Sequence, residues 1–111
     1  MTLQSIGTDI EEVSRFRNKK YSENKSFYKK IFTDDEIDYC LGKIDPYPHF
    51  TARFCAKEAT IKALKNEKYL LKNIEIKLNN NKPILILPKL ISSSVSLSHT
   101  ENYAIAFVIL N

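Results

Sequence analysis

The chain has almost no glycine, since Gly7 and Gly42 are the only two among its 111 residues. It contains no internal repeat, no low-complexity tract and no segment with the composition of a linker. These absences exclude an array of repeated units and a string of loosely joined modules. The length suits one domain of ordinary size, so we expect a single domain over residues 1–111.

Cysteine and long apolar runs are equally scarce. The two cysteines, Cys40 and Cys55, lie 15 residues apart, and neither belongs to a CxxC motif or to a Cys/His metal spacing. Reduced thiols in a cytosolic protein are the simplest interpretation. The segment MTLQSIGTDIEE has no signal-peptide pattern, and no apolar run reaches the roughly 20 residues of a membrane span. We therefore expect a cytoplasmic protein with no membrane partner.

Acidic residues are fewer than basic ones, which gives a formal net charge of +4. This balance favours an acidic partner or an anionic ligand, such as a phosphate compound, a nucleic acid or an acidic protein. A small nucleic-acid-binding domain is one alternative, because the chain also has six tyrosines and six phenylalanines. Most of these aromatic residues stand at core-like positions, however, and the basic residues are scattered. We therefore expect no nucleic-acid partner.

Periodicity predicts an α+β domain. The predicted strands cover 3–10, 73–78, 83–87, 94–99 and 103–110; the predicted helices cover 11–19, 33–42 and 50–66, with further helical turns at 27–32 and a proline-containing loop at 45–50. Thr33 and Glu36 form a capping-box motif, and Gly42 marks the end of that helix. The last strand is apolar on both faces, so we expect it at the centre of one antiparallel sheet that the helices cover.

The segment RFCAKEATIKAL, residues 53–64, has the pattern of a buried helix but carries four charges. One side of this helix is lined by large apolar residues, and another by small residues that let a neighbouring element approach closely. The charges are Arg53, Lys57, Glu58 and Lys62. Glu58 and Lys62 are one turn apart. Taken alone, they favour an ion pair on a solvated strip, which contributes only a few tenths of a kcal/mol.

Two other segments carry polar groups at the end of a predicted strand. Asp9 shares a strand face with Gly7, and it suits either a helix N-cap or a ligand-binding carboxylate. In SLSHT, Ser98, His99 and Thr100 end the strand 94–99 at a turn; a lone histidine there is usually a surface or hydrogen-bonded residue. Together with the long helix, these segments offer two carboxylates, several cations, hydroxyls and an imidazole. Such a set suits a Mg²⁺ ion that holds a phosphorylated ligand.

Four motifs, GTDIEEVSRF, FTDDE, RFCAKEATIKAL and SLSHT, occur in this order along the chain. In order and spacing the chain resembles, over nearly its whole length, the holo-[acyl-carrier-protein] synthase family of 4′-phosphopantetheinyl transferases. The resemblance implies that a serine of apo acyl carrier protein attacks the β-phosphorus of coenzyme A and releases adenosine 3′,5′-bisphosphate, for fatty acid biosynthesis. It also implies a Mg²⁺ cofactor, and a homotrimer with active sites at the subunit clefts.

The resemblance assigns the chemistry to three residues. Asp9 and Glu58 match the family's two Mg²⁺ ligands, and Lys62 matches the lysine that contacts the pyrophosphate. Glu58 and Lys62 are thereby the expected catalytic residues. Physical reasoning agrees, because a metal and a fixed ammonium both neutralise charge on the leaving group. The general base stays open between a Mg²⁺-bound water and Glu58 acting through water.

The resemblance also assigns residues that hold the two substrates. Arg53, His99 and Thr100 match positions that hold the nucleotide end of coenzyme A with its 3′-phosphate. Arg15 matches the arginine that contacts the acidic helix of the carrier protein, although an ion pair with a neighbouring glutamate would also explain it. Lys57 belongs to the same motif and is expected to have only a supporting role.

The sequence departs from the family pattern in three places. The family's glycine-rich turn after the long helix is KNEKYLLKN here, which contains no glycine. Asn81 replaces the glycine of a Gly-Lys-Pro turn, and asparagine can adopt the same left-handed conformation. Ser5 replaces the first glycine near the start. A non-catalytic scaffold of the same fold is a further alternative, but the intact Asp9, Glu58 and Lys62 disfavour it.

Overall fold

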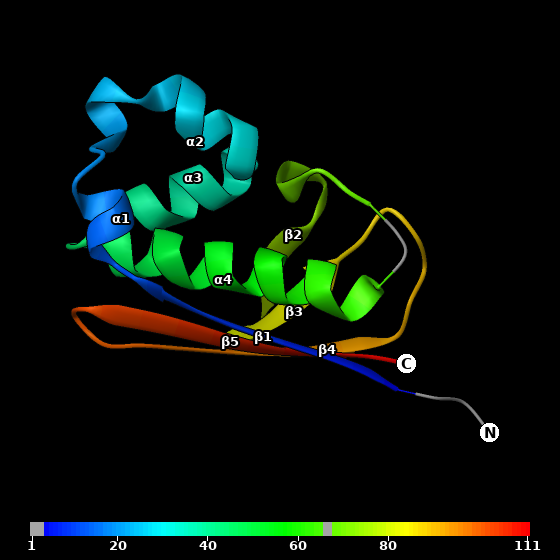
Figure 1. Cartoon of the computed structure of the whole chain (residues 1–111). Coiled ribbons are helices and arrows are strands. Elements are labelled where there is room, and N and C mark those ends of the chain that lie inside the picture. Colours follow the sequence, from blue (N-terminus) through cyan, green and yellow to red (C-terminus); the bar gives the residue numbers. More distant parts are fainter. Residues whose placement is uncertain (1–3, 66–67) are drawn as a thin grey trace.

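The computed structural model describes residues 4–65 and 68–111. The elements, with η for a 3-10 helix, are β1 Ser5–Glu12, α1 Ser14–Arg17, η1 Tyr21–Glu23, α2 Lys25–Ile31, α3 Asp34–Leu41, α4 Pro46–Leu64, η2 Leu71–Asn73, β2 Glu75–Asn79, β3 Lys82–Ile86, β4 Ser93–His99 and β5 Tyr103–Leu110. The predicted α+β class is confirmed. Figure 1 shows α4 lying along the strands, with the shorter helices packed on its other side.

The strands form two sheets rather than the single predicted one. β1, β5 and β4 make a three-stranded antiparallel sheet with β5 in the middle, which confirms the predicted central strand. β2 and β3 pair only with each other within the described residues. The segment 87–92 separates β3 from β4 and contains Pro88, which has no N–H for a ladder. The prediction of one sheet was wrong because alternation within a strand does not reveal its partner.

The first turn of α4 replaces the loop predicted over 45–50. Asp45 is the N-cap, and its carboxylate accepts a hydrogen bond from Tyr47 N–H at 3.3 Å. Pro46 and Pro48 fall within the first turn, where backbone N–H groups have no intrahelical acceptor, so proline is tolerated there. The helix ends at Leu64; the predicted end at Asn66 lies outside the described residues, as does the predicted start of the first strand at Leu3.

The region after the first strand also differs from its prediction. β1 continues through Glu12, which pairs with Tyr103, so the strand takes up the residues that were predicted to begin a helix. Only the four residues of α1 are helical there. In contrast, the predicted capping box at the start of α3 is present. Glu36 N–H donates to Thr33 Oγ1 at 3.2 Å, and Thr33 N–H donates to Glu36 Oε1 at 2.9 Å.

The core has two parts, one on each side of α4. Small residues of α4 face the three-stranded sheet, as their spacing predicted: Ala52, Cys55, Ala56, Ala59 and Ala63. Aromatic residues fill the other part, between α4 and the helices α1 to α3: Phe16, Tyr28, Phe32, Phe50 and Phe54. Cys40 and Cys55 are both buried and free. Since α4 is covered on both sides, most of its residues are buried.

Gly7 allows β1 to lie directly on the backbone of α4. A Cβ atom at this position would stand 1.9 Å from the carbonyl oxygen of Ala59, a backbone atom that cannot swing away. Glycine is therefore required for this close approach. Asp9 follows two residues later on the same face of the strand, so the contact at Gly7 also holds Asp9 close to the helix.

Asparagine and lysine occupy the left-handed backbone positions of this glycine-poor chain. Asn81 has a φ of 64° in the turn between β2 and β3, which confirms that asparagine takes the place of a turn glycine. Lys65 has a φ of 59° directly after α4, so the helix ends in a left-handed residue although no glycine is available.

Within the described residues, no helix combines the length and the apolar character that crossing a membrane requires.

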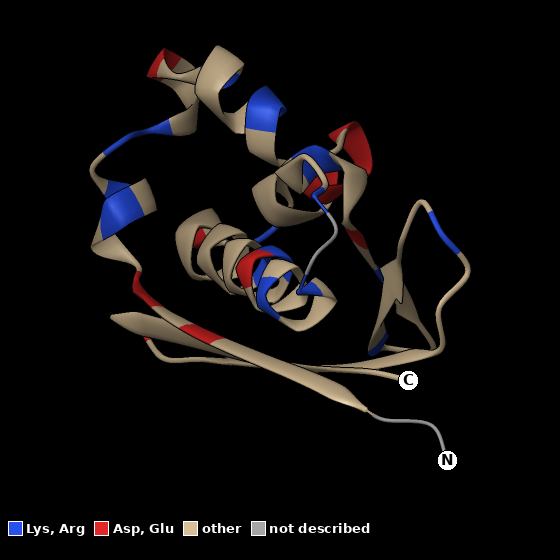
Figure 2. Ribbon diagram, turned by 45° about the vertical axis from the view of Figure 1, so that its right-hand side comes forward, with Lys and Arg blue, Asp and Glu red and all other residues tan. Residues whose placement is uncertain are grey.

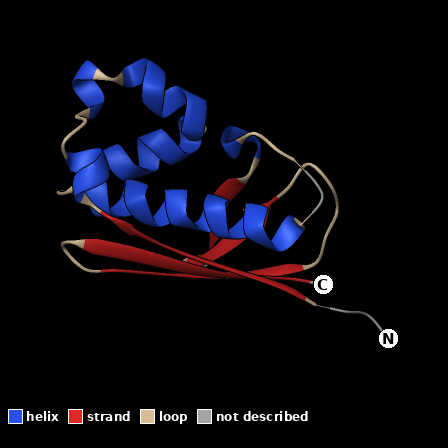
Figure 3. Ribbon diagram, viewed as in Figure 1, coloured by secondary structure: helices blue, strands red, loops and turns tan. Residues whose placement is uncertain are grey.

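The face of the three-stranded sheet that points away from α4 is apolar and exposed. Its side chains include Ile6 (67% exposed), Ile10 (63%), Tyr103 (50%), Phe107 (49%) and Ile109 (37%). Figure 3 shows all the described helices on the opposite side of this sheet. An exposed apolar patch on a sheet face is typical of a surface that binds another protein or another copy. We call this set of side chains the outer sheet face.

Candidate functional site

Asp9 and Lys62 meet between β1 and α4. The Nζ of Lys62 lies 3.1 Å from Oδ1 of Asp9 and also donates to the carbonyl oxygen of Thr8 at 3.0 Å. The side chain of Asp9 is only 17% exposed, whereas that of Lys62 is 56% exposed. Figure 2 shows the acidic stretches of β1 running beneath the charged turns of α4. Two residues 53 positions apart in the sequence are therefore neighbours, as the predicted site requires.

Glu58 lies one turn before Lys62 on α4 and is half-buried. Burial raises the pKa of the Glu58 carboxyl, and the nearby charge of Asp9 raises it further, whereas Arg15 and Lys62 lower it. The charge of Asp9 therefore disfavours the ionisation of Glu58. A divalent cation between two such groups would remove this repulsion.

The chemistry of the donor set fits Mg²⁺ rather than a transition metal. Mg²⁺ is commonly held by one or two carboxylates together with phosphate oxygens and water. Within 4–65 and 68–111, no group of three or more His, Cys, Asp or Glu side chains could hold an ion on its own. Cys55 lies near Asp9, but burial, followed by the charge of Asp9, raises the pKa of its thiol to about 12. Asp9 and Glu58 could therefore hold a metal only if a ligand supplied the remaining oxygens.

Arg15 lies close to this group and is already paired. Its Nη1 lies 2.7 Å from Oε2 of Glu11, and its guanidinium stacks on the ring of Phe54 at 4.7 Å. The side chain is 53% exposed, and its charge reaches Glu58 strongly enough to lower the pKa of that carboxyl. The neighbouring-glutamate pair considered from the sequence is therefore present. It leaves half of the arginine open to a partner.

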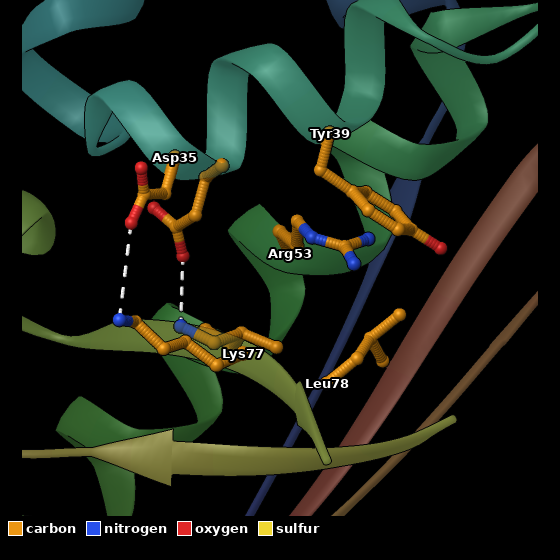
Figure 4. A pocket seen from close by; sticks show the side chains of 7 residues that line it. Asp35, Tyr39, Arg53, Lys77 and Leu78 are labelled. Atoms are coloured by element: carbon orange, nitrogen blue, oxygen red, sulfur yellow. Dashed lines mark hydrogen bonds and ion pairs between the residues drawn. The ribbon is translucent and has the colours of Figure 1, made fainter. Parts of the chain in front are cut away.

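Arg53 points to the opposite side of α4 and is only 4% exposed. Its guanidinium lies over the ring of Tyr39 at 4.2 Å, and Nη1 donates to the carbonyl oxygen of His49 at 3.4 Å. Its Nε is buried and has no hydrogen-bond partner among the described residues. Figure 4 shows Arg53 and Tyr39 lining a pocket of about 270 Å³ whose opposite wall is formed by Lys77 and Leu78 of β2. The protein therefore leaves a donor of this arginine unused.

His99 and Thr100 complete a second polar group near Arg53. The imidazole rings of His99 and His49 are 4.9 Å apart in an edge-to-face arrangement. The hydroxyl of Thr100 accepts hydrogen bonds from the N–H groups of Asn102, at 3.2 Å, and Tyr103, at 3.1 Å, so it orders the turn that presents His99. His49 is not among the predicted site residues, because it lies in a segment predicted to be a loop. Its place four residues before Arg53 was the available signal.

Lys57 does not face a ligand. Its side chain is fully buried, its Nζ lies 2.7 Å from Oε1 of Glu36, and it donates hydrogen bonds to the carbonyl oxygens of Leu71 and Ile74. Burial lowers the pKa of Lys57, and the adjacent Glu36 charge opposes that shift. This lysine connects α4 to α3 and to the chain entering β2. The supporting role expected of it is structural.

The predicted site residues thus form two groups on opposite faces of α4. Glu58 and Lys62 face β1, whereas Arg53 faces α3 and β2. Nine residues separate Arg53 from Lys62, which corresponds to about 180° of rotation and roughly 14 Å along the helix. One chain therefore brings Asp9, Glu58 and Lys62 together, and separately Arg53 and His99. It does not unite the two groups.

Comparison with known proteins gives a consistent result along nearly the whole chain. A family model described as the 4′-phosphopantetheinyl transferase superfamily matches residues 5–108. The chain is 40% identical over 111 residues to the holo-[acyl-carrier-protein] synthase of Thermodesulfovibrio yellowstonii, with 97% of this chain and 98% of the relative covered. It is 38% identical over 119 residues to that of Chlamydia caviae, with 98% of each chain covered.

Solved structures show the same similarity. A holo-(acyl-carrier-protein) synthase from Bacillus anthracis in complex with CoA (3′,5′-ADP) has a TM-score of 0.83 at 29% identity, with 96% of this chain and 94% of that chain covered. The Helicobacter pylori holo-[acyl-carrier-protein] synthase in complex with coenzyme A also has a TM-score of 0.83, at 28% identity, with 96% and 99% covered. These relatives match the chain in both sequence and fold over nearly its full length.

Proposed function

The chain belongs to the 4′-phosphopantetheinyl transferase superfamily, and from this premise we propose a Mg²⁺-dependent transfer carried out at clefts between copies of the chain. The chain is an enzyme of the holo-[acyl-carrier-protein] synthase type, which transfers phosphopantetheine from coenzyme A to an acyl carrier protein. The proposal adds the metal, the roles of individual residues, the assembly and a place in fatty acid biosynthesis. Its main support is the meeting of Asp9, Glu58 and Lys62.

In the proposed reaction, a serine hydroxyl of the carrier protein attacks the β-phosphorus of coenzyme A. A new oxygen–phosphorus bond forms, the bond to the bridging oxygen breaks, and adenosine 3′,5′-bisphosphate leaves with the bonding electrons. Lys62 contributes a positive charge that is held beside the reacting phosphate by the carbonyl oxygen of Thr8 and by Asp9. Because this charge is fixed in place before the reaction, it stabilises the negative charge that develops on the leaving group.

Asp9 and Glu58 are the proposed metal ligands. A bound Mg²⁺ would neutralise pyrophosphate oxygens, which supplies electrostatic stabilisation that the protein alone lacks. We also assign to Glu58 the acceptance of the serine proton through a water molecule. Incubation of the protein with apo acyl carrier protein, coenzyme A and Mg²⁺, followed by mass spectrometry, tests the function directly. A carrier protein that gains no phosphopantetheine mass would refute it.

A homotrimer would unite the two groups that a single chain keeps apart. Copies related by a rotation that closes a ring can place Arg53, His99 and Thr100 of one copy next to Asp9, Glu58 and Lys62 of its neighbour. The outer sheet face supports such an assembly, since it is too apolar to suit permanent contact with water. We therefore assign the coenzyme A site to clefts between copies, with the nucleotide end held by the Arg53 group.

Replacing Phe107 with lysine should convert the trimer to a monomer at micromolar concentration, because a charge placed at the centre of the outer sheet face opposes its burial. Sedimentation velocity measures the change. Leu90→Lys is the matched control, since Leu90 is fully exposed in the segment between β3 and β4, away from this face. Sedimentation of the unaltered protein as a monomer would contradict the assembly. Retention of the trimer in Phe107→Lys would contradict the proposed interface.

Reversing the charge of Arg15 should weaken the binding of the carrier protein and leave the binding of coenzyme A nearly unchanged. Acyl carrier proteins are acidic and this chain carries a net charge of +4, so charge attraction should favour their encounter. Because Arg15 is half-exposed and shared with Glu11, we expect Arg15→Glu to raise the KM for carrier protein by about tenfold to thirtyfold, or roughly 1–2 kcal/mol. Steady-state kinetics at varied carrier-protein concentration measures this, and calorimetry should show nearly unchanged binding of coenzyme A.

A variant at Arg17 provides the comparison. Arg17 belongs to the same short helix, but it is engaged by Asp45 through two hydrogen bonds of 3.1 and 2.8 Å. Arg17→Gln should therefore change the KM for carrier protein much less than Arg15→Glu does. An equal loss of affinity for both substrates in Arg15→Glu would place this residue in the nucleotide site or in the fold. No loss for either would move the contact toward Lys19 and Lys20, which follow α1 in the chain.

A further inference from the structure

We propose that His49 is a second imidazole in the site for the 3′-phosphate of coenzyme A, and that it makes the preference for coenzyme A over 3′-dephospho-coenzyme A increase as the pH falls. This inference rests on the proposed function, because it assumes that the Arg53 group holds the nucleotide end. It goes beyond that function by adding a residue and a proton-coupled selectivity.

The contacts of His49 place it inside the group rather than beside it. Its ring lies 4.9 Å from the ring of His99, and its carbonyl oxygen accepts a hydrogen bond from Arg53. The ring of Tyr39, which stacks on Arg53, also lies edge-to-face with His49 at 6.2 Å. In the part of the chain that the structure describes, no hydrogen bond is made by a ring nitrogen of either histidine. Both imidazoles can therefore donate to a ligand.

The charges around His49 favour an anion. Two cations, Arg53 and Lys43, lie near His49, and His99 is a third group that can become positively charged. The three residues come from different parts of the fold. Asp45 opposes these cations by raising the pKa of His49, but both of its oxygens are engaged by Arg17. Tyr39 contributes a neutral ring. The first turns of α4, from which His49 projects, add the positive end of the helix dipole.

Burial and these surrounding cations lower the pKa of His49, so its ring is mainly neutral at pH 7 in the free protein. A phosphate monoester is a dianion above its second pKa of about 6 and would favour the protonated ring. Binding of coenzyme A should thus draw a proton onto His49, whereas 3′-dephospho-coenzyme A, which lacks this group, should not. Because free His49 is more readily protonated at lower pH, the difference between the two ligands should grow from pH 8 to pH 6.5.

The two histidines are the only ones in the chain, so nuclear magnetic resonance of untagged protein can follow each ring separately. His49→Phe assigns the two signals and keeps an aromatic ring against His99. We expect the titration midpoint of His49 to rise by about one pH unit with coenzyme A and to stay unchanged with 3′-dephospho-coenzyme A. Calorimetry at pH 6.5 and 8 should show that His49→Phe reduces the preference for coenzyme A about tenfold at pH 6.5 and less at pH 8.

Lys43→Gln is the matched control, since it removes a cation of the same group that does not titrate in this range. This substitution should weaken the binding of coenzyme A, but the preference for coenzyme A over 3′-dephospho-coenzyme A should still depend on pH. Thermal unfolding of His49→Gln and His49→Phe separates two effects. Both variants lack the imidazole, but only His49→Phe keeps an aromatic ring that can pack against His99. If both ligands move the His49 midpoint equally, or if His49→Phe keeps the full preference at pH 6.5, the inference is wrong although the proposed function stands. If the unaltered protein binds neither ligand, the proposed function fails as well.

Discussion

Asp9→Asn and Glu58→Gln are each expected to lower kcat/KM for phosphopantetheine transfer by about a thousandfold. Each substitution removes an anionic ligand of the proposed metal site at almost constant volume, and loss of metal assistance costs several kcal/mol of transition-state stabilisation, about 4 kcal/mol for this factor. Mass spectrometry of the carrier protein over time measures the rate. Glu12→Gln is the matched control, because Glu12 is an exposed carboxylate of the same strand.

The fold of both variants should remain intact, and the effect of Glu58→Gln on stability has a defined sign. The pKa of Glu58 is higher in the folded chain than in the unfolded one, so ionisation of this carboxyl opposes folding as the pH rises above its ordinary pKa. At pH 7 without Mg²⁺, the neutral glutamine should leave the Tm equal or raise it, and this gain should disappear in acid. Full transfer activity in either variant at ordinary Mg²⁺ concentration would remove the metal assignment.

Lys57→Met is expected to be the most destabilising of the substitutions considered, at about 3–5 kcal/mol. It leaves the carboxylate of Glu36 buried without its cation, and Glu36 is only 2% exposed. The remaining partners of that carboxylate are the N–H groups of Thr33 and Ile76. A domain of this kind has a free energy of unfolding of about 5–15 kcal/mol, so the loss is a large share of the total. Urea denaturation measures it.

Two comparisons make the result specific to the buried pair. Lys77→Met removes an exposed ion pair with Asp35, 3.8 Å long, and should cost less than about 1 kcal/mol. Adding Glu36→Gln to Lys57→Met removes the stranded charge but keeps only one of the two backbone hydrogen bonds, because the amide nitrogen cannot accept from an N–H group. The second substitution should therefore restore part of the stability. If Lys57→Met costs no more than Lys77→Met, the pair does not stabilise the fold in the way described.

The sequence predicts the proximity of Asp9, Glu58 and Lys62 better than it predicts their surroundings. Asp9, Glu58 and Lys62 stand in short motifs that carry the resemblance to the family, and Glu58 and Lys62 are one turn of helix apart. The capping box at Thr33 and Glu36 is local in the same way. The second oxygen of Glu36, in contrast, accepts from Ile76, which lies 40 residues away, and no local pattern reports such a contact.

For the same reason, the sequence could not predict which elements cover each face of α4. Helical spacing separates Arg53 and Lys57 from Glu58 and Lys62, but it does not reveal that α3 and β2 cover one pair while β1 covers the other. It therefore could not show that Lys57 is structural or that the predicted site residues form two separate groups in one chain. His49 was missed because two prolines made the start of α4 resemble a loop.

In the assembly that we propose, the two charged faces of α4 would serve two different clefts at once. A copy with Asp9 replaced would disable the cleft that receives its β1, and a copy with His99 replaced would disable the other. When these two inactive variants share a ring, some clefts would draw their metal ligands from one copy and their nucleotide contacts from the other, and so would be complete. Two proteins that are each inactive alone would regain activity on mixing, and the activity of any copy would depend on the identity of its neighbours.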